Sequence, residues 1–340
     1  MKYEILELNV FRDKVKNCIS KYLNISDKIK LSIGLYSQGK TYICNLNEDE
    51  NKLMYDIGSI TKTITSHMIL KNVIDNKIDL DKRVDEYLNL KQGNYPSVYE
   101  LITHTCGYKY LSPIEITIPK LLFHRYAKYN VYTDVRKEDV IKSLEKRRKK
   151  SKKKKYYSYS DFSHAILALV LEEVEKKSFS NLLIDYCKQE LSMDNTCLQM
   201  EKRNPMSVLN DKYINSWLWN LNNPYLASGG IISNIFDMMK YIKKEIESEE
   251  EYILKGHELC NDSFSKKSKI GTTLSWHTYK DSNQLWHVGG VGTFRSSLIF
   301  NKKNKIGLVV LGNSKGIRSA NVHYLAKMIY SELKFKRVKL

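Results

Sequence analysis

The chain has 340 residues and a net charge of +18, and 42% of its residues are hydrophobic. This length gives room for about two domains, and the composition supports a packed core rather than a disordered chain. No uncharged apolar stretch approaches the ~18 residues of a membrane-spanning helix and the first residues lack the apolar run of a secretory signal, so we expect a cytoplasmic protein.

The spacing of apolar residues predicts the secondary structure in chain order. Apolar residues at helical spacing indicate an amphipathic helix over residues 5–23. Two segments that alternate at period two, 31–37 and 40–46, flank a Gln-Gly pair and predict a β-hairpin. The middle of the chain is mostly helical, with helices expected at residues 61–76, 162–175 and 236–247. Strands and a last helix follow, at residues 272–279, 283–288, 293–300, 305–312 and 320–334.

Strands at both ends of the chain with helices between them indicate an α+β fold, an α/β sandwich. Its antiparallel sheet is built from both chain ends and has flanking helices, and a mostly helical domain is inserted between the two parts of the sheet. We expect residues 1–58 with 265–340 to form the sheet domain and residues 59–264 to form the helical domain. The active site is then expected at their interface.

Half of the net charge lies in one segment, Lys146–Lys155, which reads KRRKKSKKKK. The rest of the chain is only mildly basic, so we expect no nucleic-acid partner. A single basic run is typical of a solvated loop, and such a loop can also dock on an anionic surface.

The six cysteines are scattered along the chain without a CxxC pair. In a reducing compartment this pattern predicts free thiols of mixed burial. We therefore expect no metal site.

The first segment that could carry chemistry is Asp56-Ile-Gly-Ser59-Ile-Thr-Lys62. Ser59 lies where an irregular stretch enters a helix, and Lys62 follows three residues later, so both side chains lie on one face within reach of each other. A serine at this point can be a nucleophile, because its backbone N–H is unpaired and the positive helix end favours a developing oxyanion. The lysine can take or relay the proton. The alternative is that Ser59 only caps the helix.

The second segment, Tyr159-Ser160-Asp161, directly precedes a predicted buried helix. A tyrosine near a lysine ammonium can have a pKa well below its usual value of about 10 and then act as a general base. Asp161 can accept a hydrogen bond from a substrate amide or from Lys62. The alternative for Tyr159 is a packing role, as for most of the 24 tyrosines.

The third segment, Trp286-His287-Val288-Gly289-Gly290, lies on a predicted strand. Its glycines leave open backbone, so the Gly290 N–H can be a second oxyanion donor and the strand edge can pair with an extended substrate. Alone, such a motif is an ordinary turn. A fourth segment, Leu101–Tyr108, contains His104, for which we expect a structural role.

In this order, the S-x-x-K, Y-S-D and H-x-G elements form the three-motif pattern of serine β-lactamases and penicillin-recognising peptidases. The sequence resembles the branch related to class C β-lactamases, which includes DD-carboxypeptidases, D-aminopeptidases and esterases. The resemblance runs from about residue 30 to residue 335, and its longest segments are YDIGSITKTITSHMILKNVIDNKIDLDKRVDEYL (55–88) and WHVGGVGTFRSSLIFNKKNKIGLVVLGN (286–313). It implies a β-lactamase/transpeptidase-like fold.

The resemblance also implies catalytic roles, position by position. Ser59 is the acylated nucleophile, and Lys62 and Tyr159 form its proton-transfer pair. His287 stands where relatives carry Lys or His, and it shapes the electrostatics near the base and near the polar tail of the substrate.

Further roles concern binding. The backbone N–H groups of Ser59 and Gly290 form the oxyanion hole, and Asp161 and Gly289 contact the substrate. Asp161 stands where many relatives have Asn and some have Asp, a departure that bears on β-lactam-type recognition of a side-chain amide.

These roles predict a serine hydrolase that acts through an acyl-enzyme on an amide or ester, such as a D-amino-acid-containing peptide, a small ester or a β-lactam-like compound. The expected partner is a small molecule or short peptide, and no metal or organic cofactor is needed. The alternative is a non-catalytic protein of the same fold that binds or scaffolds, anchored to an anionic surface through Lys146–Lys155. A nucleic-acid enzyme has only the charge in its favour.

Overall fold

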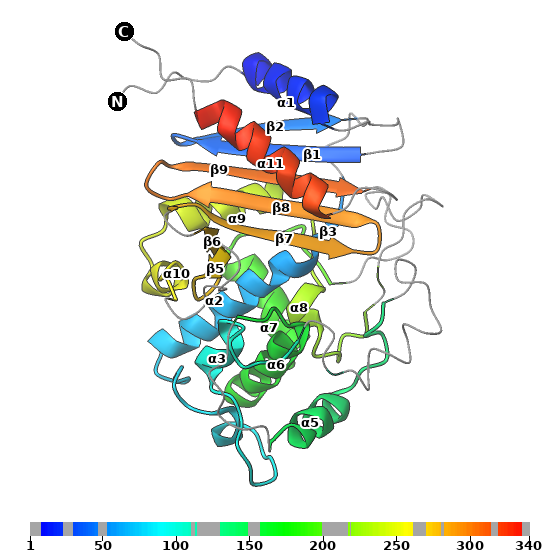
Figure 1. Cartoon of the computed structure of the whole chain (residues 1–340), viewed down its shortest axis with the longest axis vertical. Coiled ribbons are helices and arrows are strands. Elements are labelled where there is room, and N and C mark those ends of the chain that lie inside the picture. The colour runs from blue at the N-terminus through cyan, green and yellow to red at the C-terminus, as the bar shows by residue number, and fades with distance from the viewer. Residues whose placement is uncertain are drawn as a thin grey trace.

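A seven-stranded antiparallel sheet with helices on both faces dominates the protein (Figure 1). The computed structural model describes residues 8–22, 30–46, 53–109, 113, 130–148, 157–198, 217, 219–260, 270–279, 282–313 and 319–334. Among the helices in these ranges, none is both long and apolar enough to cross a lipid bilayer.

The sheet combines strands from both ends of the chain in the order β2-β1-β9-β8-β7-β6-β5. Its strands are β1 (Lys30–Ser37), β2 (Lys40–Leu46), β5 (Ile270–Thr272), β6 (His277–Tyr279), β7 (Leu285–Val291), β8 (Phe294–Asn301) and β9 (Ile306–Asn313). β1 pairs with β9 along its whole length, with Ile33 opposite Val310. The predicted α+β class, with an antiparallel sheet made from both chain ends, is therefore confirmed.

The hairpin between β1 and β2 follows from its two turn residues. Gln38 and Gly39 have φ angles of 48° and 84°, the left-handed conformation that a two-residue turn between antiparallel strands requires. The inner residues of β1 are buried on both faces, because α1 (Leu8–Tyr22) and α11 (Ser319–Lys334) cover one face of the sheet and α9 (Ile235–Glu247) covers the other (Figure 1).

The middle of the chain supplies the helices below the sheet, as predicted. Besides α9, its described part contains the α-helices α2 (Thr61–Ile74), α3 (Val98–Ile102), α5 (Lys137–Lys146), α6 (Asp161–Glu175), α7 (Phe179–Asp185), α8 (Leu226–Gly229) and α10 (Glu251–Gly256). Shorter elements are the 3-10 turns η1 (Gly58–Ile60) and η2 (Val84–Glu86), the π-turn η3 (Tyr186–Glu190) and a two-stranded sheet of β3 (Tyr55–Asp56) and β4 (Ile232–Ser233). The first 11 residues of α6, Asp161 to Leu171, are all buried, so this helix crosses the core.

One predicted strand is wrong in detail. Residues 272–279 form two short strands, β5 and β6, because the chain turns between Thr273 and Trp276. The Thr273 hydroxyl oxygen accepts hydrogen bonds from the backbone N–H groups of Ser275 (3.3 Å) and Trp276 (2.9 Å), which stabilises the turn against a continued strand. The division into two domains at residues 58 and 264 stays a prediction. One apolar core runs from the inner face of the sheet into the helices.

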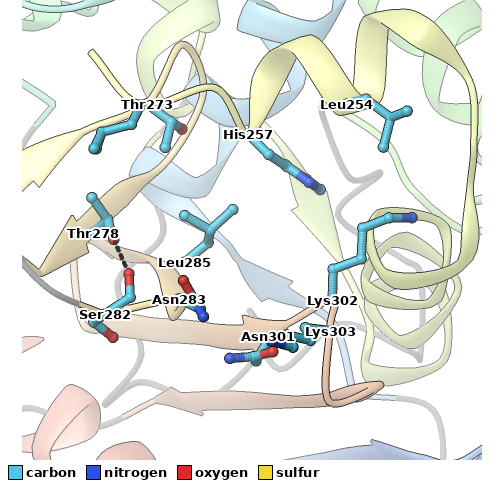
Figure 2. Close-up of a pocket in the computed structure, with 11 residues that line it drawn as sticks. Leu254, His257, Thr273, Thr278, Ser282, Asn283, Leu285, Asn301, Lys302 and Lys303 are labelled. Atoms are coloured by element: carbon cyan, nitrogen blue, oxygen red, sulfur yellow. Dashed lines mark hydrogen bonds between the residues drawn. The ribbon is translucent and has the colours of Figure 1, made fainter. Parts of the chain in front are cut away.

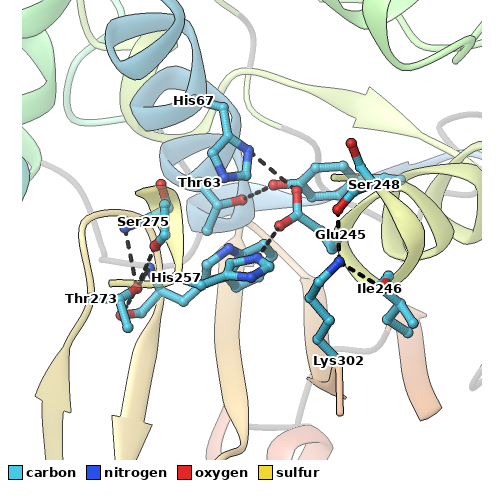
Figure 3. Close-up of polar contacts among 12 residues, drawn as sticks. Thr63, His67, Glu245, Ile246, Ser248, His257, Thr273, Ser275 and Lys302 are labelled. Carbon is cyan, nitrogen blue, oxygen red and sulfur yellow. Dashed lines mark hydrogen bonds and ion pairs between the residues drawn. The ribbon is translucent and has the colours of Figure 1, made fainter. Parts of the chain in front are cut away.

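A buried polar network fixes the position of α2 (Figure 3). The Glu245 carboxylate on α9 is fully buried, 2.8 Å from His257 Nε2 and 3.2 Å from Nδ1 of His67 on α2. Thr63 on α2 shares a 2.7 Å hydrogen bond with the Tyr241 hydroxyl. Burial lowers the pKa of His67 to about 4, so its ring is neutral near pH 7. The hydrogen bond of Thr63 and the contact of His67 thus join α2 to α9.

Candidate active site

Ser59 lies in the η1 turn that leads into α2, and its hydroxyl does not cap either element. Instead, Ser59 Oγ accepts a hydrogen bond of 3.0 Å from Lys62 Nζ. The side chain of Ser59 is partly exposed, whereas that of Lys62 is buried. The capping role is therefore wrong, and the three-residue spacing brings the hydroxyl and the amine together as expected.

Lys62 Nζ is surrounded by three oxygen atoms. It donates to Ser59 Oγ and to the Ser228 carbonyl oxygen at 2.6 Å, and it forms an ion pair with Asp161 Oδ1 at 2.6 Å. An ammonium has three protons to donate, so this set of acceptors satisfies all of them. The arrangement suits a charged Lys62 that holds Ser59 in place.

Tyr159 completes the group around Ser59. Its hydroxyl hydrogen-bonds Ser59, and its ring centre lies 4.9 Å from Lys62 Nζ. Burial and the negative charge of Asp161 raise the pKa of Tyr159 well above its usual value. The lowered pKa that we predicted for Tyr159 is therefore wrong for the free protein, because burial, and then the carboxylate of Asp161, disfavour the ionised phenol.

His104 holds the segment that carries Tyr159. Its Nδ1 accepts a hydrogen bond from the Ser160 N–H at 3.3 Å, and its carbonyl oxygen accepts one from the Ser158 N–H at 2.8 Å. Its ring centre lies 4.7 Å from that of Tyr159. Burial lowers the pKa of His104 well below its usual value, so it acts as a neutral acceptor. These contacts agree with the structural role expected for His104, which is to hold the backbone on both sides of Tyr159.

The strand β7 lies directly against the turn that carries Ser59. A Cβ on Gly289 would stand 2.0 Å from the Ile57 carbonyl oxygen, and a Cβ on Gly58 would stand 2.6 Å from the backbone nitrogen of Gly290. Gly289 is buried, while Gly290 and Ser59 reach the surface. The glycines thus let two backbones approach closely, and they place the partly exposed Ser59 beside the exposed Gly290.

His287 is buried near Tyr159, with the two ring centres 6.2 Å apart. Its Nδ1 lies 2.9 Å from the Val288 carbonyl oxygen, a contact that places the ring proton on Nδ1 and leaves Nε2 as an acceptor. The ring of His277 stacks on it at 4.6 Å. Burial, and then the neighbouring His277, lower the pKa of His287, so it contributes a neutral acceptor rather than a charge.

The sequence model of the family described as Beta-lactamase matches residues 47–329. The chain belongs to the Beta-lactamase family. Among solved structures, a class C β-lactamase superposes with a TM-score of 0.78 at 15% identity, over 98% of this chain and 99% of that one. The Beta-lactamase/D-alanine carboxypeptidase from Yersinia pestis, complexed with citrate, gives a TM-score of 0.75 at 18% identity, over 94% of this chain and 98% of that one. At these identities the likeness shows a shared fold.

A curated relative is Protein flp from Staphylococcus aureus (strain MW2), 22% identical over 296 residues. The match covers 81% of this chain and 54% of that protein. The chain thus spans about half the length of the curated relatives it matches.

Within this Beta-lactamase family member, three residues at the site were missed in the sequence. Tyr132 donates its hydroxyl to Asp161 Oδ2 at 3.1 Å, Ser228 offers its carbonyl oxygen to Lys62, and His277 stacks on His287. Ser228 lies in LASGG, which precedes β4 and could have been noticed for its small residues. Tyr132 and His277 carry no signal that separates them from packing residues.

A hollow of about 530 Å³ lies between α10 and the end of the sheet formed by β6, β7 and β8 (Figure 2). It contains none of the predicted site residues. Its charged groups are largely engaged within the protein: His257 bonds to Glu245, and Lys302 Nζ donates to the carbonyl oxygens of Ile246 and Ser248. The group of residues around Ser59 is therefore the better candidate for chemistry.

The basic run lies mostly outside the described residues. Of Lys146–Lys155, the structure describes Lys146 at the end of α5 and the two arginines that follow. The guanidinium of Arg147 packs 5.7 Å from the ring centre of Phe162 and donates to the Ser143 carbonyl oxygen. Contact with an anionic surface through the run stays a prediction.

Proposed function

We propose that this protein is a serine hydrolase that forms an acyl-enzyme at Ser59 with an amide or ester substrate. One observation carries the proposal: the hydroxyl of the partly exposed Ser59 is hydrogen-bonded to both Lys62 and Tyr159, and the exposed backbone of Gly290 lies against the same turn. A serine that served only to pack or to cap a helix would need neither partner.

The proposed reaction has two steps. In the first, the Lys62–Tyr159 pair, after losing one proton to solvent, takes the Ser59 proton while Oγ attacks the carbonyl carbon. The N–H groups of Ser59 and Gly290 then stabilise the oxyanion, and each such donor contributes about 3 kcal/mol to lowering the barrier. The same pair returns the proton to the leaving group. In the second step, water attacks the acyl-enzyme and frees Ser59.

For the substrate, we propose a small acyl compound: a D-amino-acid-containing peptide, a small ester or a β-lactam-like molecule. The names of the related β-lactamases and of the D-alanine carboxypeptidase support this range. The strand β6 pairs with only Leu285 and Trp286 of β7, so among the described residues no strand covers the β7 edge at Gly289 and Gly290. That edge can hydrogen-bond an extended substrate.

The test is intact-mass spectrometry of the purified chain with a fluorophosphonate probe, and then with a penicillin, a D-Ala-D-Ala peptide and short acyl esters. We expect one covalent adduct on Ser59 with the probe and none in Ser59→Ala. A transient or lasting adduct within the panel would identify the substrate class. Adduct formation that persists in Ser59→Ala would refute the proposal, and no adduct with any compound would favour the binding or scaffolding alternative.

A further inference from the structure

Asp161 makes contacts on both of its carboxylate oxygens. Oδ1 pairs with Lys62 Nζ at 2.6 Å, and Oδ2 accepts the Tyr132 hydroxyl proton at 3.1 Å. The side chain of Asp161 is 10% exposed and that of Lys62 is 2% exposed. The two charges are thus held together with little access for water.

The Asp161 carboxylate also lies at the start of a helix. It is the first residue of α6, after Ser160, whose hydroxyl caps the helix by accepting from the Ser163 N–H. A carboxylate in the first turn is stabilised by the positive end of the helix. An asparagine at the same place would keep the geometry but would leave the ammonium of Lys62 without a counter-charge.

The neighbouring ionisable groups supply no negative charge that could replace the Asp161 carboxylate beside Lys62. Burial lowers the pKa of the four histidines nearby and raises that of Tyr157, so these groups are neutral near pH 7. They come from the His104 segment, α6, β6, β7 and the Tyr157–Tyr159 segment: His104, His164, His277, His287 and Tyr157. Arg295 on β8 directs Nη1 to the carbonyl oxygens of Gly292 and Phe294. Among the described neighbours of Ser59, Lys62 and Asp161 therefore form a pair of zero net charge.

We propose that Asp161 is a positioning residue that neutralises Lys62, so that Ser59 is activated mainly at alkaline pH rather than at neutral pH. The inference deepens the proposed function and rests on it. Loss of a proton from Tyr159 or from Lys62 would leave Asp161 and its neighbours with a net negative charge, which a buried site disfavours. The raised pKa of Tyr159 agrees with this reasoning.

The test compares Asp161→Asn with the parent chain by the rate of fluorophosphonate labelling between pH 6 and pH 10. Asparagine removes the charge of residue 161 and keeps its shape. The pH at which the labelling rate rises should therefore be lower in the variant by about one unit or more. Labelling at pH 7 should then be about tenfold faster in the variant, since one pKa unit corresponds to a tenfold change in the reactive fraction. Tyr132→Phe is the matched control: it removes the contact to Asp161 Oδ2 but keeps the charge, so its profile should not move to the acid side.

The outcomes separate the two proposals. If Asp161→Asn labels no faster at pH 7, or if Tyr132→Phe gives the same acid shift, the neutralising role of Asp161 is wrong while Ser59 remains the nucleophile. If the parent chain is not labelled at any pH, the proposed function itself fails. The parent chain gives a further check that does not depend on a variant: a labelling rate that is already constant from pH 7 upwards would overturn the inference.

Discussion

Gly289 lies so close to Ile57 that a Cβ at position 289 would stand 2.0 Å from the Ile57 carbonyl oxygen and 2.3 Å from Ser296 Oγ. Ser296 Oγ itself donates to that carbonyl oxygen at 2.7 Å. The turn before Ser59 is therefore joined to β7 and β8 through backbone contact and one short hydrogen bond. Any side chain at 289 must push the strand away from the nucleophile.

The first prediction concerns Gly289→Ala. Displacing β7 moves the Gly290 N–H away from the oxyanion, and loss of one such donor slows acylation by about 100-fold or more. Probe labelling rates and ester turnover measure this effect. Gly229→Ala is the matched control, because a Cβ there would be in ordinary contact at 3.6 Å from the nearest atom, and it should stay within about twofold of the parent chain. Equal rates for the two variants would contradict the role assigned to the β7 backbone.

The second prediction separates catalysis from stability at Lys62. Lys62→Met leaves the Asp161 carboxylate buried without its cation, which should lower the free energy of unfolding by about 3 kcal/mol. It should also slow labelling of Ser59 by about 100-fold or more, because proton transfer is lost. The double variant Lys62→Met with Asp161→Asn should regain most of the stability but none of the labelling. Urea denaturation and labelling rates measure the two effects, and recovery of both together would show that Lys62 has only a structural role.

The site was predictable from the sequence where contacts are local. Ser59 and Lys62 are three residues apart at the start of a helix, so their meeting follows from helix geometry. The sheet follows from the alternation of apolar and polar residues in the hairpin and in the C-terminal strands. The raised pKa of Tyr159 was not predictable in this way, because it follows from the burial of its hydroxyl and then from where Asp161 points. Lys62 and Asp161 are far apart in the sequence, and only the packing of α2 against α6 reveals that they neutralise each other.

The turn between β5 and β6 also could not be predicted from a local sequence pattern. The alternation in residues 272–279 predicts one strand, but the Thr273 side chain competes for backbone N–H groups and bends the chain. Tyr132 likewise cannot be selected from 24 tyrosines by its spacing. Side-chain contacts between distant segments decide such positions, and a pattern in one sequence does not record them.

The third prediction is a loss of stability in mild acid. Five buried histidines have pKa values below their usual 6.5, mainly because burial disfavours the charged ring: His67 (about 4), His277 (about 3), His104, His164 and His287. Below pH 6.5 the unfolded chain takes up protons that the folded chain does not, so the free energy of unfolding is highest above pH 6.5 and falls as the pH decreases toward 4. Each histidine contributes on the order of 1 kcal/mol per pH unit in this range.

Urea denaturation followed by circular dichroism between pH 8 and pH 5 measures this dependence. The midpoint should be constant above pH 7 and should fall steeply below pH 6.5. His277→Phe keeps an aromatic ring against His287 and removes one of the five titrating groups, so its stability should fall less steeply. A midpoint that does not change between pH 7.5 and pH 5.5 would show that these rings are protonated, or accessible to water, in the folded protein.

The fourth prediction concerns Glu245, whose carboxylate is fully buried between His67 and His257. Glu245→Ala removes the partner of His257 and leaves a cavity beside α2, so the free energy of unfolding should fall by about 3 kcal/mol or more. The matched control is Glu173→Ala, which breaks an exposed pair with Lys176 and should cost less than about 1 kcal/mol. Because Glu245 contacts His67 on α2, the helix that follows the Ser59 turn, the folded variant should also label more slowly at Ser59. Labelling that is unchanged in folded Glu245→Ala would show that the η1 turn is held by β7 alone and that α2 does not need this network for its orientation.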